Sequence, residues 1–166
     1  MSKNIIFVTG FFGAPIMQTA QALAEEKGYN LKVLDKEIEK ADGRSARRIC
    51  MMMGEHEYRN KEYEALKSIV DEYSSIIEAS SSIASNGIVV CCGDGVLHDD
   101  MSKELIESYE LIVLGGNLSC EELWNNAKEI DDSYHAFMCF GTEEEKHSSF
   151  VKLHERQRVL FTPYIV

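Results

Sequence analysis

The sequence predicts an α/β fold in three layers, with an open, mostly parallel sheet and helices on both faces. Short apolar runs rich in β-branched residues alternate with longer amphipathic segments, which is typical of such sheets. Glycines directly follow several of the apolar runs and predict the connecting turns. The length of 166 residues fits a single domain spanning residues 1–166.

The N-terminal part predicts a β-α-β unit. Asn4 to Thr9 is apolar and predicts a buried strand. Pro15 suits the first turn of a helix, because the N–H group that it lacks would be unpaired there, and Gly28 is typical of a helix end. We therefore expect a helix over Ile16 to Lys27 and a short strand over Leu31 to Leu34.

The same alternation continues to about residue 128. The predicted elements are helical material over 36–53 interrupted at Gly43, a long amphipathic helix over 55–83, a strand over 87–92, a short helix over 102–108, a strand over 111–114, and a helix from the capping box of Ser119 and Glu122 to about Lys128.

The pattern weakens from Glu129 to Phe150, where we expect a mobile loop. A last helix is predicted from Val151 to Phe161, and an extended tail or short strand from Pro163 to Val166. The acidic run Glu143 to Glu145 is nevertheless typical of the first turn of a helix.

Charge and composition exclude several classes of function. The net charge of −11 and the pI of about 4.9 disfavour nucleic acid and anionic lipid as partners. The apolar runs are far shorter than the roughly 20 residues that cross a bilayer, and no signal peptide is recognisable, so we expect a cytosolic protein. Five cysteines without a CxxC pair, and histidines without ligand spacing, predict neither a disulfide framework nor a metal site.

Candidate functional residues follow the predicted strands. Ligands of open parallel sheets bind beyond the carboxyl ends of the strands. The turns there hold Gly10 and Gly13, Asp35, Gly93 and Gly95, and a Gly115-Gly116 pair. A glycine turn before a helix can bind an anion with its N–H groups, or it can simply turn the chain, and the glycines alone do not decide between the two.

A family resemblance adds to this pattern. The run from Ile5 to Gly13 resembles the start of shikimate kinases, which are small P-loop kinases. The stretch Asp35 to Glu62 looks like the shikimate-binding region of that family, and Gly93-Asp-Gly95 stands where the family has a glycine triplet. The resemblance implies a P-loop-kinase architecture and a place in aromatic amino acid biosynthesis.

The resemblance also implies roles for individual residues. Asp35 would hold substrate hydroxyls and orient the nucleophile as the catalytic residue, and Arg59 would pair with the substrate carboxylate, while Gly93 and Gly95 let the backbone approach the ligand. These roles suit the chemistry of a carboxylate and of a planar guanidinium. Taken singly, Asp35 could instead be a helix cap and Arg59 a solvated surface charge.

The phosphate side departs from the family. A P-loop reads G-x-x-x-x-G-K-[ST], but counting from Gly10 this chain has Pro15, Ile16 and Met17 at the second glycine, the lysine and the hydroxyl positions. The Walker A motif is therefore degenerate, and only Gly10 and Gly13 remain of the phosphate loop.

Other family positions also differ. Val33 stands at the Mg²⁺-binding aspartate, and the lid region near His135 has no arginine. The late-helix arginine aligns best with Gln157, although Arg158 or Arg156 could replace it, and we take Arg158 as the candidate. The C-terminal strand, adenine loop and closing helix of the family have no counterpart among residues 162–166.

Three hypotheses follow. The first is a pseudoenzyme impaired in ATP-dependent phosphoryl transfer that acts as a regulatory subunit or binds a small anionic hydroxy-acid such as shikimate. The second is an active shikimate kinase, which would need ATP, Mg²⁺ and a cation from elsewhere, Arg44, Arg47 and Arg48 being the nearest. The third is a structural or interaction module with a filled nucleotide pocket, acting through a protein partner or as a homo-oligomer.

Overall fold

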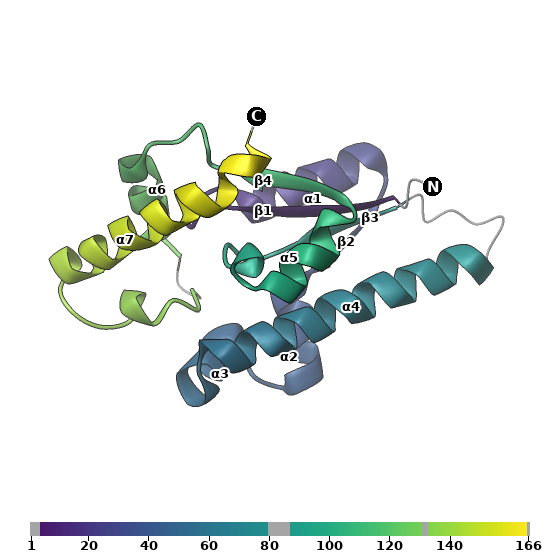
Figure 1. The fold of residues 1–166 in the computed structure, drawn as a ribbon, viewed down its shortest axis with the longest axis horizontal. Coiled ribbons are helices and arrows are strands. Elements are labelled where there is room, and N and C mark those ends of the chain that lie inside the picture. The colour runs from purple at the N-terminus through teal and green to yellow at the C-terminus, as the bar shows by residue number, and fades with distance from the viewer. Residues whose placement is uncertain (1–3, 80–86, 131–132, 166) are drawn as a thin grey trace.

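The computed structural model describes residues 4–79, 87–130 and 133–165 (Figure 1). In chain order the elements are β1 (Ile5–Gly10), α1 (Ile16–Lys27), β2 (Asn30–Val33), α2 (Leu34–Asp42), α3 (Ala46–Met53), α4 (Glu55–Ala79), β3 (Ile88–Cys91), η1 (Val96–His98), α5 (Asp100–Glu107), β4 (Glu110–Leu114), α6 (Cys120–Ala127), η2 (Ala136–Met138), α7 (Glu143–Phe161) and η3 (Thr162–Tyr164).

The four described strands form one parallel sheet in the order β2-β3-β1-β4. β1 lies between β3 and β4, with Phe7 opposite Val90 on one side and Leu111 on the other. Since parallel strands all end at the same edge, the turns after β1 and β3 are neighbours there. The predicted fold class is confirmed.

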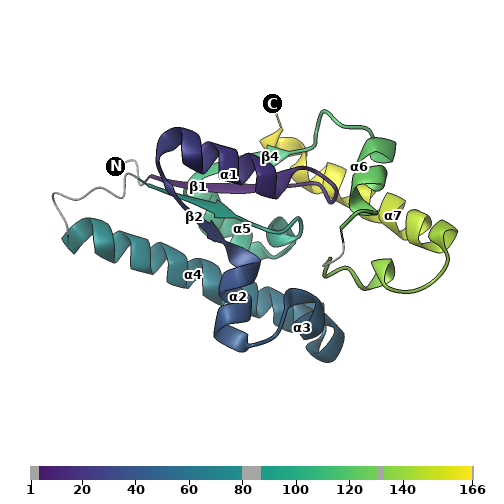
Figure 2. The same ribbon diagram turned by 180° about the vertical axis from the view of Figure 1, so that it is seen from behind.

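Side chains alternate between the two faces of the sheet, as the period of a strand requires. Ile6, Val8 and Val89 pack against Ala20 and Ala24 of α1. The opposite face carries the larger core, to which α4, α5, α6 and α7 contribute. Figure 1 shows α5 and α7 in front of the sheet, and Figure 2 shows α1 on the other side, which gives the three predicted layers.

Most element boundaries in the first half agree with the predictions. α1 has the predicted bounds and ends at Gly28, whose φ of 66° is the left-handed conformation that glycine adopts without strain. Asp35 does not close a strand, because β2 ends at Val33 and Asp35 lies in the first turn of α2. The predicted continuation of α4 over residues 80–83 lies outside the described residues.

The C-terminal part differs from the prediction. The expected loop over 129–150 is wrong from Glu143 onward, because α7 begins there with a capping box of Thr142 and Glu145. The acidic run was therefore the correct signal for the helix start. The extended tail or short strand expected over Pro163 to Val166 is instead a short 3-10 turn, η3, up to Tyr164, and Val166 lies outside the described residues.

The capping box of Ser119 and Glu122 at the start of α6 is confirmed. Within the described ranges, no helix is both long enough and apolar enough to cross a membrane.

Candidate functional site

The carboxyl edge of the sheet holds a cavity of about 630 Å³. Its lining comes from the turn after β1 and the start of α1, from the ends of β2 and β3, and from the segment that follows α6. Asp35, Gly93 and Asp94 line it, together with Tyr134 and Glu129. The structure thus brings together at one cavity turns that are far apart in the sequence.

The turn after β1 has used most of its backbone donors internally. Phe11 N donates to Leu114 O at 3.0 Å, Ala14 N to Phe11 O at 2.9 Å and Ile16 N to Ala14 O at 2.8 Å. Pro15 has no N–H group to offer. A phosphate-binding turn needs such donors pointed at the anion, so this turn is poorly equipped to hold a phosphate.

Gly10 and Gly13 are required by close packing of the turn. Gly13 has a φ of 98°, and a Cβ there would overlap the carbonyl oxygen of Leu123 in α6. A Cβ on Gly10 would lie 3.0 Å from the carbonyl carbon of Leu114. Both glycines therefore let β1 and its turn approach neighbouring backbone.

Gln157 of α7 ties two of the turns together. Its Oε1 accepts from Phe12 N at 3.0 Å, while its Nε2 donates to the Asp94 carboxylate at 2.9 Å and to the Asp94 carbonyl at 3.3 Å. The side chain is only 1% exposed. A neutral amide thus occupies the Phe12 N donor, which is therefore not free to bind a ligand.

Asp94 extends this network to the segment before α7. Its carboxylate also lies 2.8 Å from Nε2 of His135, whose ring stacks against Phe12 and Tyr134. Burial alone would raise the pKa of Asp94, but the His135 ring and the Gln157 amide outweigh it and hold the pKa below its ordinary value. Thr9 adds a bond from its hydroxyl to Gly93 O at 2.8 Å.

Arg59 is buried in α4 rather than solvated, with 6% of its surface exposed. Its guanidinium contacts Glu62 at 2.8 Å, Glu55 at 3.1 Å and the Tyr134 hydroxyl at 2.7 Å. Burial alone would lower the pKa of Arg59, yet Glu62 and Tyr134 raise it above its ordinary value. Burial raises the pKa of Glu62 to about 7 despite the attraction of Arg59.

Gly95 fits closely against this group. A Cβ there would overlap both Arg59 Nη2 and the Tyr134 hydroxyl, so the position has room only for glycine. The guanidinium lies between the rings of Tyr58 and Tyr134, with centroid distances of 5.2 and 5.0 Å. Arg59 therefore has protein partners at both terminal nitrogens.

Asp35 lies at the cavity, as a ligand-binding carboxylate must. The Tyr58 hydroxyl donates to its Oδ1 at 2.6 Å, and a Cβ on Gly93 would lie 4.0 Å from the same oxygen. Burial and the carboxylates of Glu62 and Asp35 raise the pKa of Tyr58, so its hydroxyl remains a donor at neutral pH.

Arg158 is not part of this group. It is exposed on α7 and borders a different cavity of about 510 Å³ with Phe11, Gly116 and His154. Successive residues of a helix point about 100° apart, so with Gln157 turned inward Arg158 turns to the surface. The sequence alignment had pointed to Gln157, and the inward position agrees with that alignment.

The cavity is strongly acidic. Asp35, Asp94 and Glu129 line it, and none of its described lining residues is lysine or arginine. Arg44 pairs with Asp42 at 2.6 Å, Arg47 donates to Ser133 O at 2.9 Å, and neither these two nor Arg48 lines the cavity. The cation required by the second hypothesis is therefore not supplied by these three residues.

ATP and Mg²⁺ do not fit the residues that are present. Pro15, Ile16 and Met17 line the cavity where a lysine and a hydroxyl would be needed. In residues 4–79, 87–130 and 133–165, no group of three or more His, Cys, Asp or Glu side chains is arranged to hold a metal ion.

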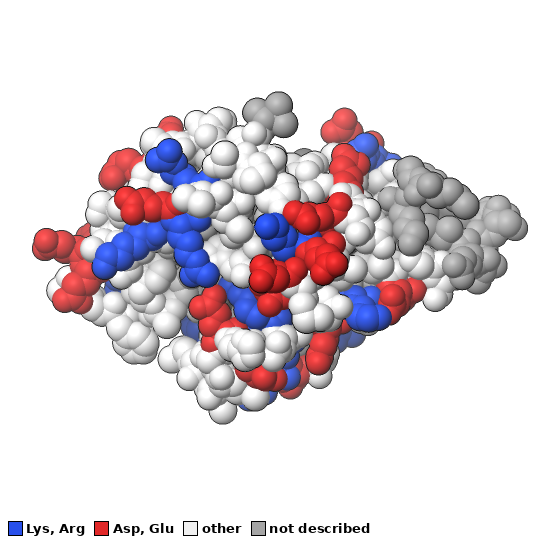
Figure 3. Space-filling model, viewed as in Figure 1, with Lys and Arg blue, Asp and Glu red and all other residues white. Residues whose placement is uncertain are grey.

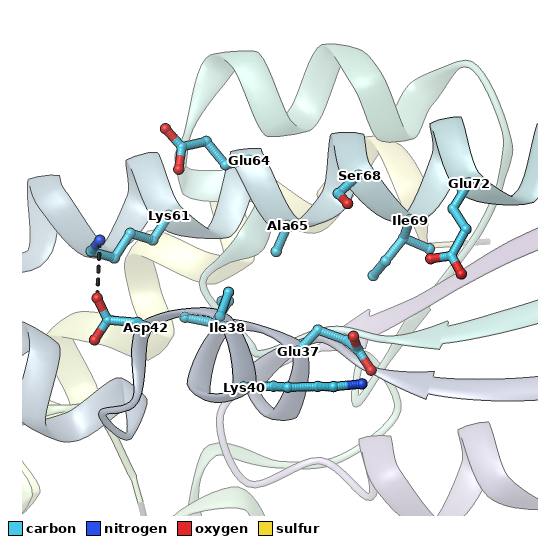
Figure 4. A pocket seen from close by; sticks show the side chains of 11 residues that line it. Glu37, Ile38, Lys40, Asp42, Lys61, Glu64, Ala65, Ser68, Ile69 and Glu72 are labelled. Atoms are coloured by element: carbon cyan, nitrogen blue, oxygen red, sulfur yellow. Dashed lines mark ion pairs between the residues drawn. The ribbon is translucent and has the colours of Figure 1, made fainter.

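A second cavity of about 450 Å³ lies between α2 and α4 (Figure 4). Asp42 there pairs with Lys61 at 3.1 Å, and the hydrogen bond from Arg44, followed by that from Lys61, lowers the pKa of Asp42. Its charges are mixed, and none of the candidate residues lines it.

Four residues of the site were not predicted as functional. Tyr134, His135 and the side chain of Asp94 join the network from loops, and Glu62 pairs with Arg59. The spacing of Arg59 and Glu62, three residues apart in a helix, was a signal for the ion pair. Nothing in the local sequence links Tyr134 to Arg59, which lies 75 residues earlier.

Comparison with known proteins gives a consistent family. Residues 18–133 match the family model described as shikimate kinase. The shikimate kinase of Chlorobaculum tepidum is 32% identical over 110 residues, which make up 66% of this chain and 51% of that enzyme. The bifunctional shikimate kinase/3-dehydroquinate synthase of Thermotoga maritima is 30% identical over 109 residues, which make up 66% of this chain and 20% of that protein. The chain thus spans about half or less of the length of these curated relatives.

Solved structures share the fold. The shikimate kinase of Bacteroides thetaiotaomicron has a TM-score of 0.75 at 17% identity, covering 95% of this chain and 81% of that one. The shikimate kinase of Acinetobacter baumannii in complex with shikimate has a TM-score of 0.69 at 20% identity, covering 93% and 78%.

Proposed function

The chain belongs to the shikimate kinase family, and we propose that it is a member that no longer transfers phosphate from ATP but binds a small polyhydroxylated ligand at the carboxyl edge of its sheet. The loss of ATP chemistry and the retained ligand site are supported by different observations.

One observation carries the loss of ATP chemistry: the cavity beside the turn after β1 has three carboxylates and, among its described lining residues, no basic side chain. Phosphoryl transfer depends on positioning and on positive charge around the transferred group. Removing single groups of this kind costs on the order of 10²- to 10³-fold in rate, so the absence of several of them implies turnover far below that of an active kinase.

A coupled ADP-release assay with shikimate and ATP–Mg²⁺ tests this part, with the Chlorobaculum tepidum enzyme as the active reference. We expect no ADP formation above the protein-free background and no rise in Tm with ATP–Mg²⁺. Turnover that requires both substrates and yields phosphorylated shikimate would show that the chain is an active kinase and would contradict this part of the proposal.

The ligand site is supported by Asp35. Its carboxylate lines the cavity beside Gly93, and Tyr58 holds it in position with a hydrogen bond of 2.6 Å. A carboxylate so placed can accept hydrogen bonds from neighbouring hydroxyls of a ligand. The Acinetobacter baumannii relative with the same fold was solved in complex with shikimate, a polyhydroxylated ring.

Thermal unfolding with a panel of polyhydroxylated rings, shikimate included, tests the ligand site. A ligand at 100 times its Kd stabilises the folded state by about 2.7 kcal/mol, which raises Tm by several degrees. We expect Asp35→Asn to remove most of this rise. Glu37→Gln, on the same helix but outside this cavity, is the control and should retain it. A panel that leaves Tm unchanged would remove the ligand site from the proposal.

Three expectations from the sequence stay predictions: a single domain over 1–166, a cytosolic location, and a protein partner or homo-oligomer.

A further inference from the structure

Asp94 replaces the middle residue of the glycine triplet to which the Gly93-Asp-Gly95 turn corresponds by resemblance. Its side chain is 7% exposed and points into the protein, where His135 and Gln157 hold the carboxylate at 2.8 and 2.9 Å. A buried charge is stable only when it is paired or hydrogen-bonded, and this one is. The family's backbone position thus carries an internal acid group.

The guanidinium that the resemblance assigns to a ligand carboxylate already has internal partners. Arg59 Nη1 is bonded to Glu62, and Nη2 is bonded to Glu55 and Tyr134. Its Nε has no hydrogen-bond partner among the described residues, but this atom is buried and is not reachable from solvent. Arg59 does not line the cavity.

The charges that a ligand would meet in the cavity are therefore negative. Asp35, Asp94 and Glu129 line it, whereas the His135 ring and the Arg59 guanidinium, which lower the pKa of Asp94, are not among its lining residues, and Glu62 pairs with Arg59. The lowered pKa of Asp94 keeps its carboxylate ionised at neutral pH. An uncharged polyhydroxylated ligand would lose only the hydration of its hydroxyls there, whereas an anionic one would incur the larger cost of desolvating a charge and would also be repelled.

From this arrangement we infer that Asp94 determines the charge of the ligand, so that the site takes an uncharged polyhydroxylated ring and rejects the corresponding hydroxy-acid. The inference rests on the proposed ligand site and narrows its ligand class. The Asp35 carboxylate still accepts hydrogen bonds from the ligand hydroxyls. The internal carboxylate of Asp94 already occupies His135 and Gln157, the polar partners that an acid group on the ligand would need.

Shikimate and its methyl ester form a matched pair of probes, because they share the hydroxylated ring and differ in one negative charge. Isothermal titration with the wild-type protein should give at least about 10-fold tighter binding of the ester than of shikimate. Asp94→Gly restores the glycine triplet and removes the charge together with the side chain, so the ester should lose most of its advantage over shikimate. Asp94→Asn keeps the size of the side chain, removes its charge, and should reduce the preference several-fold.

Asp100→Asn is the matched control, since it removes one negative charge from the neighbouring α5, where Asp100 is exposed and does not line the cavity. It should leave the ratio of the two affinities unchanged. Circular dichroism of each variant verifies that it is folded, and Asp94→Asn gives the test if Asp94→Gly does not fold.

The outcomes separate the inference from the proposal beneath it. Tighter binding of shikimate than of the ester by the wild-type protein overturns the inference alone. The inference is also overturned if Asp100→Asn changes the ratio of the two affinities as much as Asp94→Asn does, because the effect would then come from the overall charge of the protein. If the wild-type protein binds neither probe and no other ring of the panel, the proposed ligand site itself is contradicted.

Discussion

Gln157 shows how one neutral side chain can satisfy polar groups of two turns at the carboxyl edge of the sheet. Its amide accepts from Phe12 N and donates to both the carboxylate and the carbonyl of Asp94. A buried donor or acceptor left without a partner costs about 1–3 kcal/mol. The network therefore contributes to the stability of the protein as well as to the shape of the site.

Gln157→Ala should lower the free energy of unfolding by about 2–4 kcal/mol, because it leaves Phe12 N and part of Asp94 unpaired and opens a cavity. Urea unfolding measures the change, and an unchanged m-value would show that the unfolded state is unaffected. Arg158→Ala removes the neighbouring but exposed side chain and should change the free energy of unfolding by less than about 0.5 kcal/mol. Equal effects of the two substitutions would contradict the buried bridge.

His98 is a half-buried base near the same edge, and its buried Nε2 has no hydrogen-bond partner among the described residues. Burial, followed by the charge of Arg156, lowers its pKa from 6.5 to about 4. Between these two values the unfolded chain binds a proton on His98 and the folded protein does not. Stability that is fully present above pH 6.5 is therefore lost as the pH falls towards 4.

His98→Asn should reduce this loss, making the decrease in unfolding free energy between pH 6.5 and pH 4 smaller by roughly 2 kcal/mol than in the wild-type protein. Chemical unfolding at several pH values measures both curves. His56→Asn is the control, because His56 is exposed, and its curve should parallel that of the wild-type protein. If the curve of His98→Asn also parallels that of the wild-type protein, the lowered pKa of His98 in the folded protein is contradicted.

At the scale of elements, the turn from β1 to α1 is held by contacts with α6, α7 and the segment before α7. Gly13 is held against the Leu123 carbonyl of α6, and Phe12 packs on His135 and Phe150. Large aromatic side chains of this kind bury apolar area and stabilise the turn. The turn thus packs against the core through its aromatic side chains while it also lines the cavity.

Gly13→Ala and Gly43→Ala separate backbone strain from packing. Both glycines have a positive φ, 98° and 88°, but only at Gly13 would the new Cβ overlap another atom. Gly43→Ala should cost about 1 kcal/mol from strain alone. Gly13→Ala should cost at least about 2 kcal/mol more, as urea unfolding would measure. Equal decreases in the free energy of unfolding for the two variants would contradict the close contact between Gly13 and the Leu123 carbonyl of α6.

At the scale of the whole molecule, the excess of negative charge sets the response to salt. Acidic and basic side chains lie next to one another on the face in Figure 3, but the net charge of the chain is −11. Such an excess repels itself in the compact state and is screened by salt, with a Debye length of about 10 Å at 0.1 M.

The free energy of unfolding should therefore rise between 10 and 200 mM NaCl. The double variant Glu25→Lys and Glu26→Lys reverses two exposed charges on α1 and lowers the net negative charge, so its rise should be smaller. Urea unfolding at each salt concentration compares the two proteins. A flat dependence in the wild-type protein would mean that local ion pairs already balance the excess.

Much of the fold could be predicted from local patterns. The bounds of α1 follow from Pro15 and Gly28, and the start of α6 from the capping box of Ser119, because these signals act within a few residues. The start of α7 had an equally local signal in Thr142 and Glu145, which the weak apolar periodicity of that region obscured. Local chemistry thus determines where these helices begin and end.

The sequence by itself determined the parallel α/β sheet and placed Ile16 and Met17 where a P-loop has its lysine and hydroxyl. Only the tertiary structure decided that Gln157 turns inward to Phe12, 145 residues away, and that Tyr134 takes a terminal nitrogen of Arg59. Periodicity and capping depend on neighbours in the chain, whereas these contacts depend on which side chains meet after the sheet and helices have packed.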